Sequence, residues 1–141
     1  MKNVNENKTS DVKLVKHFIK DLSFENLQEI NHNSVKNNEG NITLDMNVVY
    51  QAYDGDFFSL VLNDTFDCIS KEKKEKIFHL ELDYFGFFQN LDKNNTNQKN
   101  MTQNGLKLIF PFIKEIIENI TQKGGCGRIT LNEIDFDDFE S

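Results

Sequence analysis

Apolar and polar side chains alternate along the first two thirds of the chain, and a repeat of two residues predicts β-strands. The clearest run is residues 41–50, in which every second side chain is apolar. Asp54-Gly55 follows it, and an Asp-Gly pair between two alternating runs is typical of a tight hairpin. Alternation resumes at residues 58–66 and, after a charged turn, at residues 78–84. The three runs predict an antiparallel meander.

A weaker alternating run, residues 15–25, precedes the meander and predicts one additional strand. In an uninterrupted strand, one face would carry Phe18, Leu22 and Phe24, and the other face Ile19, Asp21, Ser23 and Glu25.

After Gly105 the apolar residues recur every three or four positions, which predicts an amphipathic helix. Pro111 fits near the start of this helix, where its missing amide hydrogen matters little. Glycines at positions 124, 125 and 127 predict the end of the helix. Residues 129–139 predict a short extended piece leading into a brief helix. We therefore expect an α+β fold, in which a four-stranded antiparallel sheet (the meander plus an N-terminal strand) packs with one long C-terminal amphipathic helix.

With 141 residues the chain has the size of one domain. Residues 1–13 and 90–105 are rich in Asn, Lys, Thr and Gln, a composition typical of solvated segments. We expect a flexible N-terminal tail at residues 1–13, a long loop at residues 90–105, and a single domain over residues 14–141.

Sixteen Lys and Arg against 23 Asp and Glu give a net charge of −7, which disfavours binding to nucleic acids and to anionic membrane surfaces. No apolar run approaches the roughly 18 residues that span a bilayer. The first residues are polar and contain no secretory leader, and Cys68 and Cys126 share no motif, as expected for reduced thiols. These features predict a soluble, cytoplasmic protein.

No motif for a nucleophile, a phosphate loop or a metal cluster occurs, so we expect no enzyme activity, no metal site and no cofactor. A reactive thiol at Cys126, in a glycine tract beside Arg128, is the alternative. A helix end followed by a turn explains the same tract more simply.

Charged residues gather on the polar face of the predicted sheet. They are Asp21 and Glu25 on the first strand and His79, Glu81 and Asp83 on the last. One interpretation is a single acidic patch that binds a partner. The other is the ordinary solvent-facing side of a sheet.

Two sequence blocks, Lys20-Asp21-Leu22-Ser23-Phe24-Glu25 and Leu108-Ile109-Phe110-Pro111-Phe112, resemble those of the bacterial export chaperones of the SecB family. The ending Asn132-Glu133-Ile134-Asp135-Phe136 is similar as well. The likeness covers about residues 15–139, and the spacing of the blocks matches too. The resemblance implies a homotetramer, built as a dimer of dimers through helix packing and sheet-edge contacts.

SecB proteins hold unfolded precursor proteins in apolar grooves without ATP and deliver them to the SecA motor, so the resemblance implies the same activity here. In the family, the zinc-bearing C-terminal tail of SecA docks on the acidic face of the sheet. Asp21, Glu25 and Glu81 fall on matching positions. His79 falls in that docking site where the family commonly carries an apolar residue.

Clients need exposed apolar surface, and Phe85, Phe87 and Phe88 stand nearly together in the sequence. Consecutive residues cannot all face one side of a strand. We expect Phe85, Phe87, Phe88 and Phe136 to line a client-binding groove, with burial inside an oligomer as the alternative for the first three.

Two departures from the family favour a second hypothesis. Residues 26–41, at the position of the family's crossover loop, lack the aromatic residues that help to line the groove, and family members usually continue beyond Ser141. The alternative is an oligomeric scaffold that binds a folded partner through its acidic face and does not hold unfolded chains. An enzyme is the third option.

Overall fold

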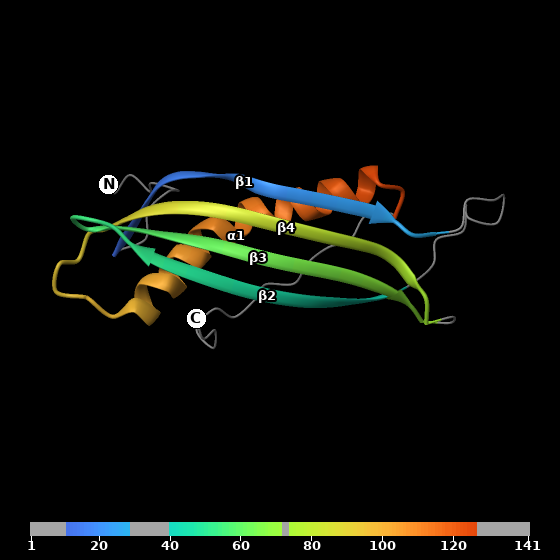
Figure 1. Cartoon of the computed structure of the whole chain (residues 1–141), viewed down its shortest axis with the longest axis horizontal. Helices are drawn as coiled ribbons and strands as arrows, with labels where there is room; N and C mark the ends of the chain where they lie inside the picture. Colours follow the sequence, from blue (N-terminus) through green and yellow to red (C-terminus); the bar gives the residue numbers. More distant parts are fainter. Residues whose placement is uncertain (1–10, 29–39, 72–73, 127–141) are drawn as a thin grey trace, which may run out of the picture.

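A computed structural model describes residues 11–28, 40–71 and 74–126 of the chain. In these ranges it contains a four-stranded antiparallel sheet and one helix (Figure 1). The elements are β1 (Val12–Asn26), β2 (Gly40–Ala52), β3 (Phe57–Ser70), β4 (Lys76–Asn90) and α1 (Gln98–Lys123). The strand order is β1-β4-β3-β2, so the meander of β2, β3 and β4 is extended by β1 at the β4 edge. The predicted fold class is confirmed.

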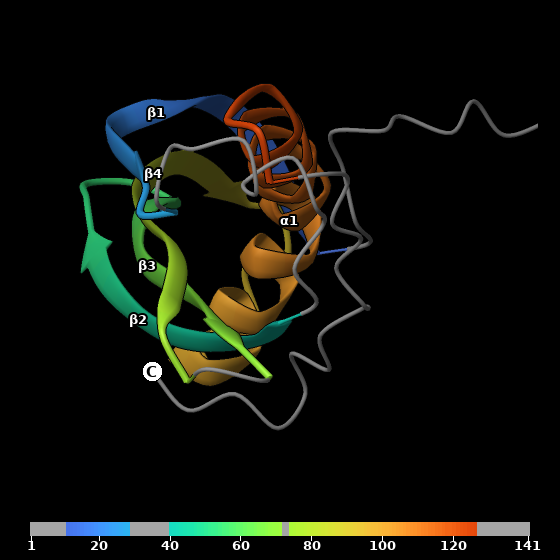
Figure 2. The ribbon, with the colours of Figure 1, turned by 90° about the vertical axis from the view of Figure 1, so that its right-hand side faces the viewer.

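The core lies between α1 and one face of the sheet, which we call the inner face (Figures 1 and 2). Every second residue of β3 and β4 is buried there, because side chains alternate between the two faces of a strand. The largest fully buried side chains are Phe58, Phe66, Phe78, Phe88, Leu60, Leu62, Leu80, Leu82, Leu106, Ile109, Ile113 and Ile117. Within the described ranges, the opposite, outer face of the sheet carries no helix (Figure 2).

The close approach of α1 to the sheet depends on a glycine in the helix. A Cβ at Gly105 would lie 2.7 Å from Leu60 Cδ1 and 3.2 Å from the ring of Phe88. Near its other end α1 reaches β1, where Gly124 lies against the ring of Phe24. The helix therefore crosses the inner face from β3 towards β1.

The helix begins earlier than the sequence pattern predicts, because part of the predicted loop 90–105 is helical. Asn97 caps the helix by accepting a hydrogen bond from the amide of Asn100, at 3.2 Å. Met101, Thr102 and Gln103 are buried although two of them are polar. The polar composition therefore predicted a loop where the cap and tertiary packing stabilise the start of the helix.

Pro111 therefore lies in the interior of α1 and not near its start, as predicted. A proline at this position cannot donate the amide hydrogen bond of a regular helix. Its side chain is exposed. The helix tolerates it because packing of the apolar face, and not local preference, stabilises most helices in proteins.

Two register shifts interrupt β1, one between Leu14 and Lys16 and the other between Ile19 and Asp21. Each extra residue exchanges the faces of the residues beyond it. Phe18 therefore lies on the outer face opposite Phe85, and not on the face of Leu22 and Phe24 as predicted. The strand begins at Val12, so Val12 and Leu14 belong to the core, and the predicted tail at residues 11–13 is partly strand.

Candidate docking surface on the outer face of the sheet

The outer face divides into two halves along the strands, and the first is acidic. Its members are Asp21, Glu25, Asp45, Asp67, His79, Glu81 and Asp83, which we call the acidic half. Cross-strand pairing brings them together, because Asp21 is opposite Asp83 and Asp67 is opposite His79. Side chains opposite one another on a face lie about 5 Å apart. Six carboxylates thus share one end of the outer face.

His79 lies at the centre of the acidic half between two carboxylates. Its Nδ1 is 2.6 Å from Asp67 Oδ1, and its Nε2 is 3.0 Å from Glu81 Oε1. The hydrogen bonds to Asp67 and Glu81 raise the pKa of His79 above its usual value, and the two negative charges add to this effect. A protonated imidazole donates through both nitrogens, so the cation is the form that satisfies both carboxylates.

Asp67 is held by two cationic neighbours, since Lys76 Nζ lies 3.4 Å from the same Oδ1. Burial raises the pKa of Asp67, but the hydrogen bonds from His79 and Lys76 and their positive charges outweigh burial, so the net pKa is lowered. Asp67 therefore remains ionised, and Lys76 and the protonated form of His79 offset its charge.

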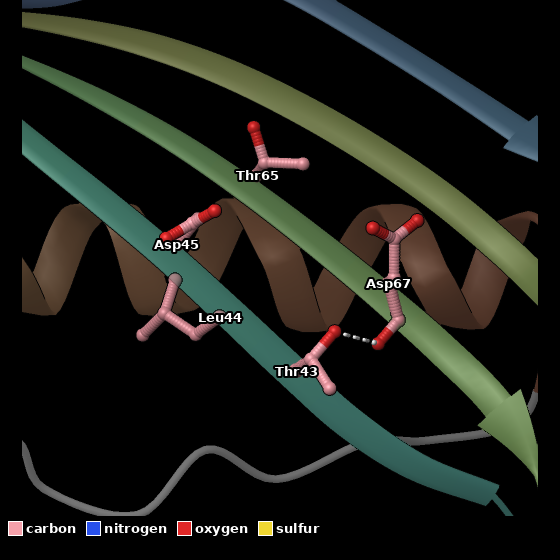
Figure 3. A pocket seen from close by; sticks show the side chains of 5 residues that line it. All are labelled: Thr43, Leu44, Asp45, Thr65 and Asp67. Atoms are coloured by element: carbon pink, nitrogen blue, oxygen red, sulfur yellow. Dashed lines mark hydrogen bonds between the residues drawn. The ribbon is translucent and has the colours of Figure 1, made fainter.

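A shallow hollow of about 210 Å³ lies beside this cluster, between β2 and β3 (Figure 3). It is lined by Thr43, Leu44, Asp45, Thr65 and Asp67. Figure 3 shows the side chains of Asp45, Thr65 and Asp67 projecting from the sheet while α1 passes behind it. Carboxylate and hydroxyl oxygens line this hollow, which suits a cationic or hydrogen-bond-donating side chain of a partner.

The other half of the outer face is aromatic. It consists of Phe18, Tyr53, Phe57, Val61, Phe85 and Phe87, which we call the aromatic half. Phe18 stacks on Phe85 at 4.8 Å between ring centroids, and Phe57 stacks on Phe87 at 5.4 Å. Phe18 is 42% exposed and Tyr53 is 41% exposed. Contiguous exposed aromatic residues of this kind commonly mark a binding surface.

The structure thus brings together the four residues predicted for partner docking, Asp21, Glu25, His79 and Glu81. Phe85 and Phe87 from the predicted client-binding set lie in the aromatic half. Phe88 is 0% exposed and stacks on Phe58 at 5.1 Å, so in the protomer it belongs to the core. Phe136 lies outside the described residues.

Sequence reasoning missed Asp45, Asp67 and Phe18 as members of these two halves. The polar alternation of the runs already placed Asp45 on an outward face. Only the register shows which outward residues are neighbours across strands, and the shift after Ile19 is what brings Phe18 to Phe85.

A buried carboxyl group on the inner face was also missed. Asp64 lies opposite Met46 on β2 and Leu82 on β4 and is 2% exposed. Neither of its carboxylate oxygens has a hydrogen-bond partner in the part of the chain that the structure describes. Burial raises the pKa of Asp64 to about 7, and the charge of Asp83 adds to the shift.

Neither metal ligation nor thiol chemistry finds support in the described ranges. They contain no group of three or more His, Cys, Asp and Glu side chains that could hold a metal ion. Cys68 and Cys126 are free, and burial raises the pKa of both thiols, which disfavours the reactive thiolate. Residues 11–28, 40–71 and 74–126 also contain no helix with the length and apolarity that a membrane crossing requires.

A family model matches nearly the whole chain. The family described as preprotein translocase subunit SecB matches residues 5–139. The protein-export protein SecB of Orientia tsutsugamushi (strain Boryong) is 33% identical over 123 residues, which cover 84% of this chain and 74% of that protein. The protein-export protein SecB of Rickettsia peacockii is 28% identical over 138 residues, covering 95% and 89% of the two chains.

The fold has a solved counterpart as well. The Mycobacterium tuberculosis SecB-like chaperone, solved in complex with a ChAD peptide from the HigA1 antitoxin, superposes with a TM-score of 0.70 at 9% identity. The superposition covers 89% of this chain and 92% of that chain. Fold and sequence together define a chaperone that acts in protein export. The chain belongs to the SecB family.

Proposed function

We propose that this protein is an ATP-independent holdase, which keeps non-native precursor proteins competent for translocation and delivers them to the SecA motor. The observation that carries the proposal is the outer face of the sheet, where an acidic half adjoins an exposed aromatic half. A holdase needs a surface that binds apolar segments of many different sequences and catalyses no reaction on them. Burial of apolar area supplies such affinity at about 25 cal/mol per Å².

In this proposal the acidic half receives the zinc-bearing C-terminal tail of SecA through Asp21, Glu25, His79 and Glu81. Complementary charge favours encounter and fixes orientation. Asp21, Glu25 and Glu81 carry exposed side chains that a cationic tail can reach at the surface. His79 would contribute hydrogen bonding and charge where its relatives offer apolar contact.

Phe85 and Phe87 form the client-binding surface in the same proposal, together with Phe136. Both rings are partly exposed and are backed by stacked aromatic neighbours, so they present apolar area without losing much side-chain entropy on binding. Phe88 supports this surface from the core, because it is buried on the inner face of the same strand. We further propose a cytoplasmic homotetramer, a dimer of dimers, as the working assembly.

Binding of the tail tests the docking part of the proposal. The double variant Asp21→Lys with Glu81→Lys should abolish binding of a SecA tail peptide loaded with zinc, because attraction becomes repulsion at two points of the site. Isothermal titration calorimetry would measure binding, and native mass spectrometry would establish that the variant keeps the wild-type oligomer.

The dependence of the affinity on salt concentration is a second test of docking at the acidic half. Exposed complementary charges are screened beyond about 8 Å at physiological ionic strength, so the wild-type affinity should fall as salt increases. Glu115→Lys, a charge reversal on the exposed side of α1, is the matched control and should bind as the wild type does. Unchanged binding by the double variant, or an affinity that does not depend on salt, would show that the acidic half is not the docking site.

A further inference from the structure

His79 contacts two carboxylates of the acidic half at the same time. Its Nδ1 is 2.6 Å from Asp67 Oδ1, and its Nε2 is 3.0 Å from Glu81 Oε1. A neutral imidazole carries a hydrogen on only one nitrogen, so it can donate to only one of these oxygens. The protonated ring donates to both, and its positive charge strengthens both hydrogen bonds. The geometry therefore fits the imidazolium form.

The two carboxylates differ in how well a partner can reach them. The side chain of Asp67 is 19% exposed, and its Oδ1 is also 3.4 Å from Lys76 Nζ. The side chain of Glu81 is 59% exposed. Asp67 thus anchors the ring of His79, whereas Glu81 is the carboxylate for which His79 and a cation of the partner compete.

Charged groups from three strands face His79. Glu25 on β1 and Asp67 on β3 lie opposite it, and Glu81 follows it on β4, while Lys76 adds a positive charge beside Asp67. Helix α1 passes on the other side of the sheet (Figure 3). The hydrogen bonds to Asp67 and Glu81 raise the pKa of His79 above its usual value of 6.5. The ring therefore stays protonated at pH values at which an isolated histidine is largely neutral.

Protonation of His79 changes what the acidic half offers to a basic partner. The imidazolium places a positive charge in the middle of the acidic half and pairs with Glu81. Like charges repel, so this form opposes the approach of a basic side chain. Loss of the proton removes that charge, and the carboxylate of Glu81 can then accept hydrogen bonds from the partner.

We propose that His79 makes docking at the acidic half dependent on pH: its protonated ring occupies Glu81 and repels the basic residues of the docking tail, and its neutral form leaves Glu81 to them. This inference rests on the proposed docking of the SecA tail and adds the regulation of that site. Docking is then weak at low pH and strengthens as pH rises through the titration of His79.

Binding of the zinc-loaded SecA tail peptide at two pH values tests the inference. Isothermal titration calorimetry should show about tenfold tighter binding by the wild type at pH 9 than at pH 6, since a contact with a charged group is gained and a like charge is removed. Equal affinity at the two pH values would overturn the inference.

Two substitutions at position 79 fix the site in one state or the other. His79→Leu cannot be protonated, so it should bind the peptide at pH 6 about as tightly as at pH 9. His79→Arg carries a permanent charge, so at both pH values it should bind about tenfold more weakly than the wild type does at pH 9. A full pH dependence in His79→Leu, or tight binding by His79→Arg, would contradict the assignment.

Two other titratable residues serve as controls. Asp64 lies on the inner face of β3, and burial raises its pKa to about 7, within the same range of pH. His17 lies on the inner side of β1, where its Nδ1 is 2.5 Å from the hydroxyl oxygen of Tyr84. Asp64→Leu and His17→Gln should both keep the pH dependence of the wild type. Its loss in either variant would assign the effect to that residue and overturn the inference.

Proton release on binding tests the inference in the wild type without relying on a variant. Because the tail prefers the neutral ring, binding must displace protons from His79 while the ring is partly protonated. Calorimetry at pH 7.5 in buffers of different ionisation enthalpy should report net release of protons by the wild type and much less by His79→Leu. Proton uptake, or no exchange in the wild type, would refute the competition for Glu81.

The same measurements separate this inference from the proposed docking. If the wild type binds the peptide at neither pH, docking itself fails, and the inference fails with it. If the wild type binds equally tightly at both pH values, docking stands and the inference alone fails. Native mass spectra should show the same oligomer at pH 6 and pH 9. Dissociation at pH 6 would assign the lost affinity to assembly and would also overturn the inference.

Discussion

The sequence predicts the face on which His79 lies but not its closest partner. The alternation of its strand places it on the outer face with Glu81, and that much could be predicted. Asp67, its closer partner at 2.6 Å, comes from β3, and nothing local in the sequence joins the two residues. The charge that the acidic half presents at neutral pH therefore depends on a cross-strand pair that the register creates.

Asp64 is the residue whose chemistry is least consistent with its surroundings. Its carboxyl group, whose two oxygens have no hydrogen-bond partner among the described residues, occupies an apolar position on the inner face. Because the pKa of Asp64 is about 7 in the folded protein and near 3.8 in the unfolded chain, the folded state binds the extra proton between these two values. The free energy of unfolding then falls as pH rises through this window, by about 1.4 kcal/mol per pH unit.

Replacing this side chain should remove that dependence. Asp64→Leu keeps the branched shape of the side chain and needs no hydrogen-bond partner, so the variant should be more stable than the wild type by about 2–4 kcal/mol at pH 8 and by less at pH 5. Urea denaturation at several pH values gives both quantities. Asp45→Leu, on the outer face of neighbouring β2, is the control. Equal slopes of stability against pH for the wild type and Asp64→Leu would contradict the assignment.

The sequence predicted the strands more accurately than the helix. Alternation located β2, β3 and β4, since a half-buried sheet requires a period of two. The start of α1 was not predicted because its cap, Asn97, and two of its early buried residues, Thr102 and Gln103, are polar. The faces of Phe18 and Ile19 relative to the rest of β1 could not be predicted, since a bulge leaves no mark in the pattern of residue types.

The proline inside α1 should destabilise the helix. Pro111→Ala restores a helical amide hydrogen bond at an exposed position, so the variant should be more stable by about 1–3 kcal/mol. Urea denaturation with a far-ultraviolet circular dichroism readout would measure the change. Glu115→Ala, an exposed change in the same helix, should shift the midpoint much less. A lower midpoint for Pro111→Ala would show that the proline is required by the packing of the helix.

At the scale of the whole molecule, the α+β architecture and the family could both be predicted, because a few spaced blocks and two periodicities carry that information. The composition of the candidate surface could be predicted only in part. Asp21, Glu25, His79 and Glu81 were expected together and lie together, whereas Phe88 was expected at the surface and fills the core. On β4 the alternation already places Asp83 next to Phe85, whereas their neighbours on β1, Asp21 and Phe18, appear only when the two strands are aligned residue by residue.

Retention of unfolded chains without nucleotide distinguishes the proposed holdase from a scaffold. Native mass spectrometry of the purified protein, recorded alone and after dilution of a urea-unfolded precursor into it, separates the two functions. We expect a tetramer that retains the unfolded chain in the absence of ATP. An oligomer that captures none of several unrelated unfolded chains would contradict the holdase and favour a scaffold that binds one folded partner through the acidic half.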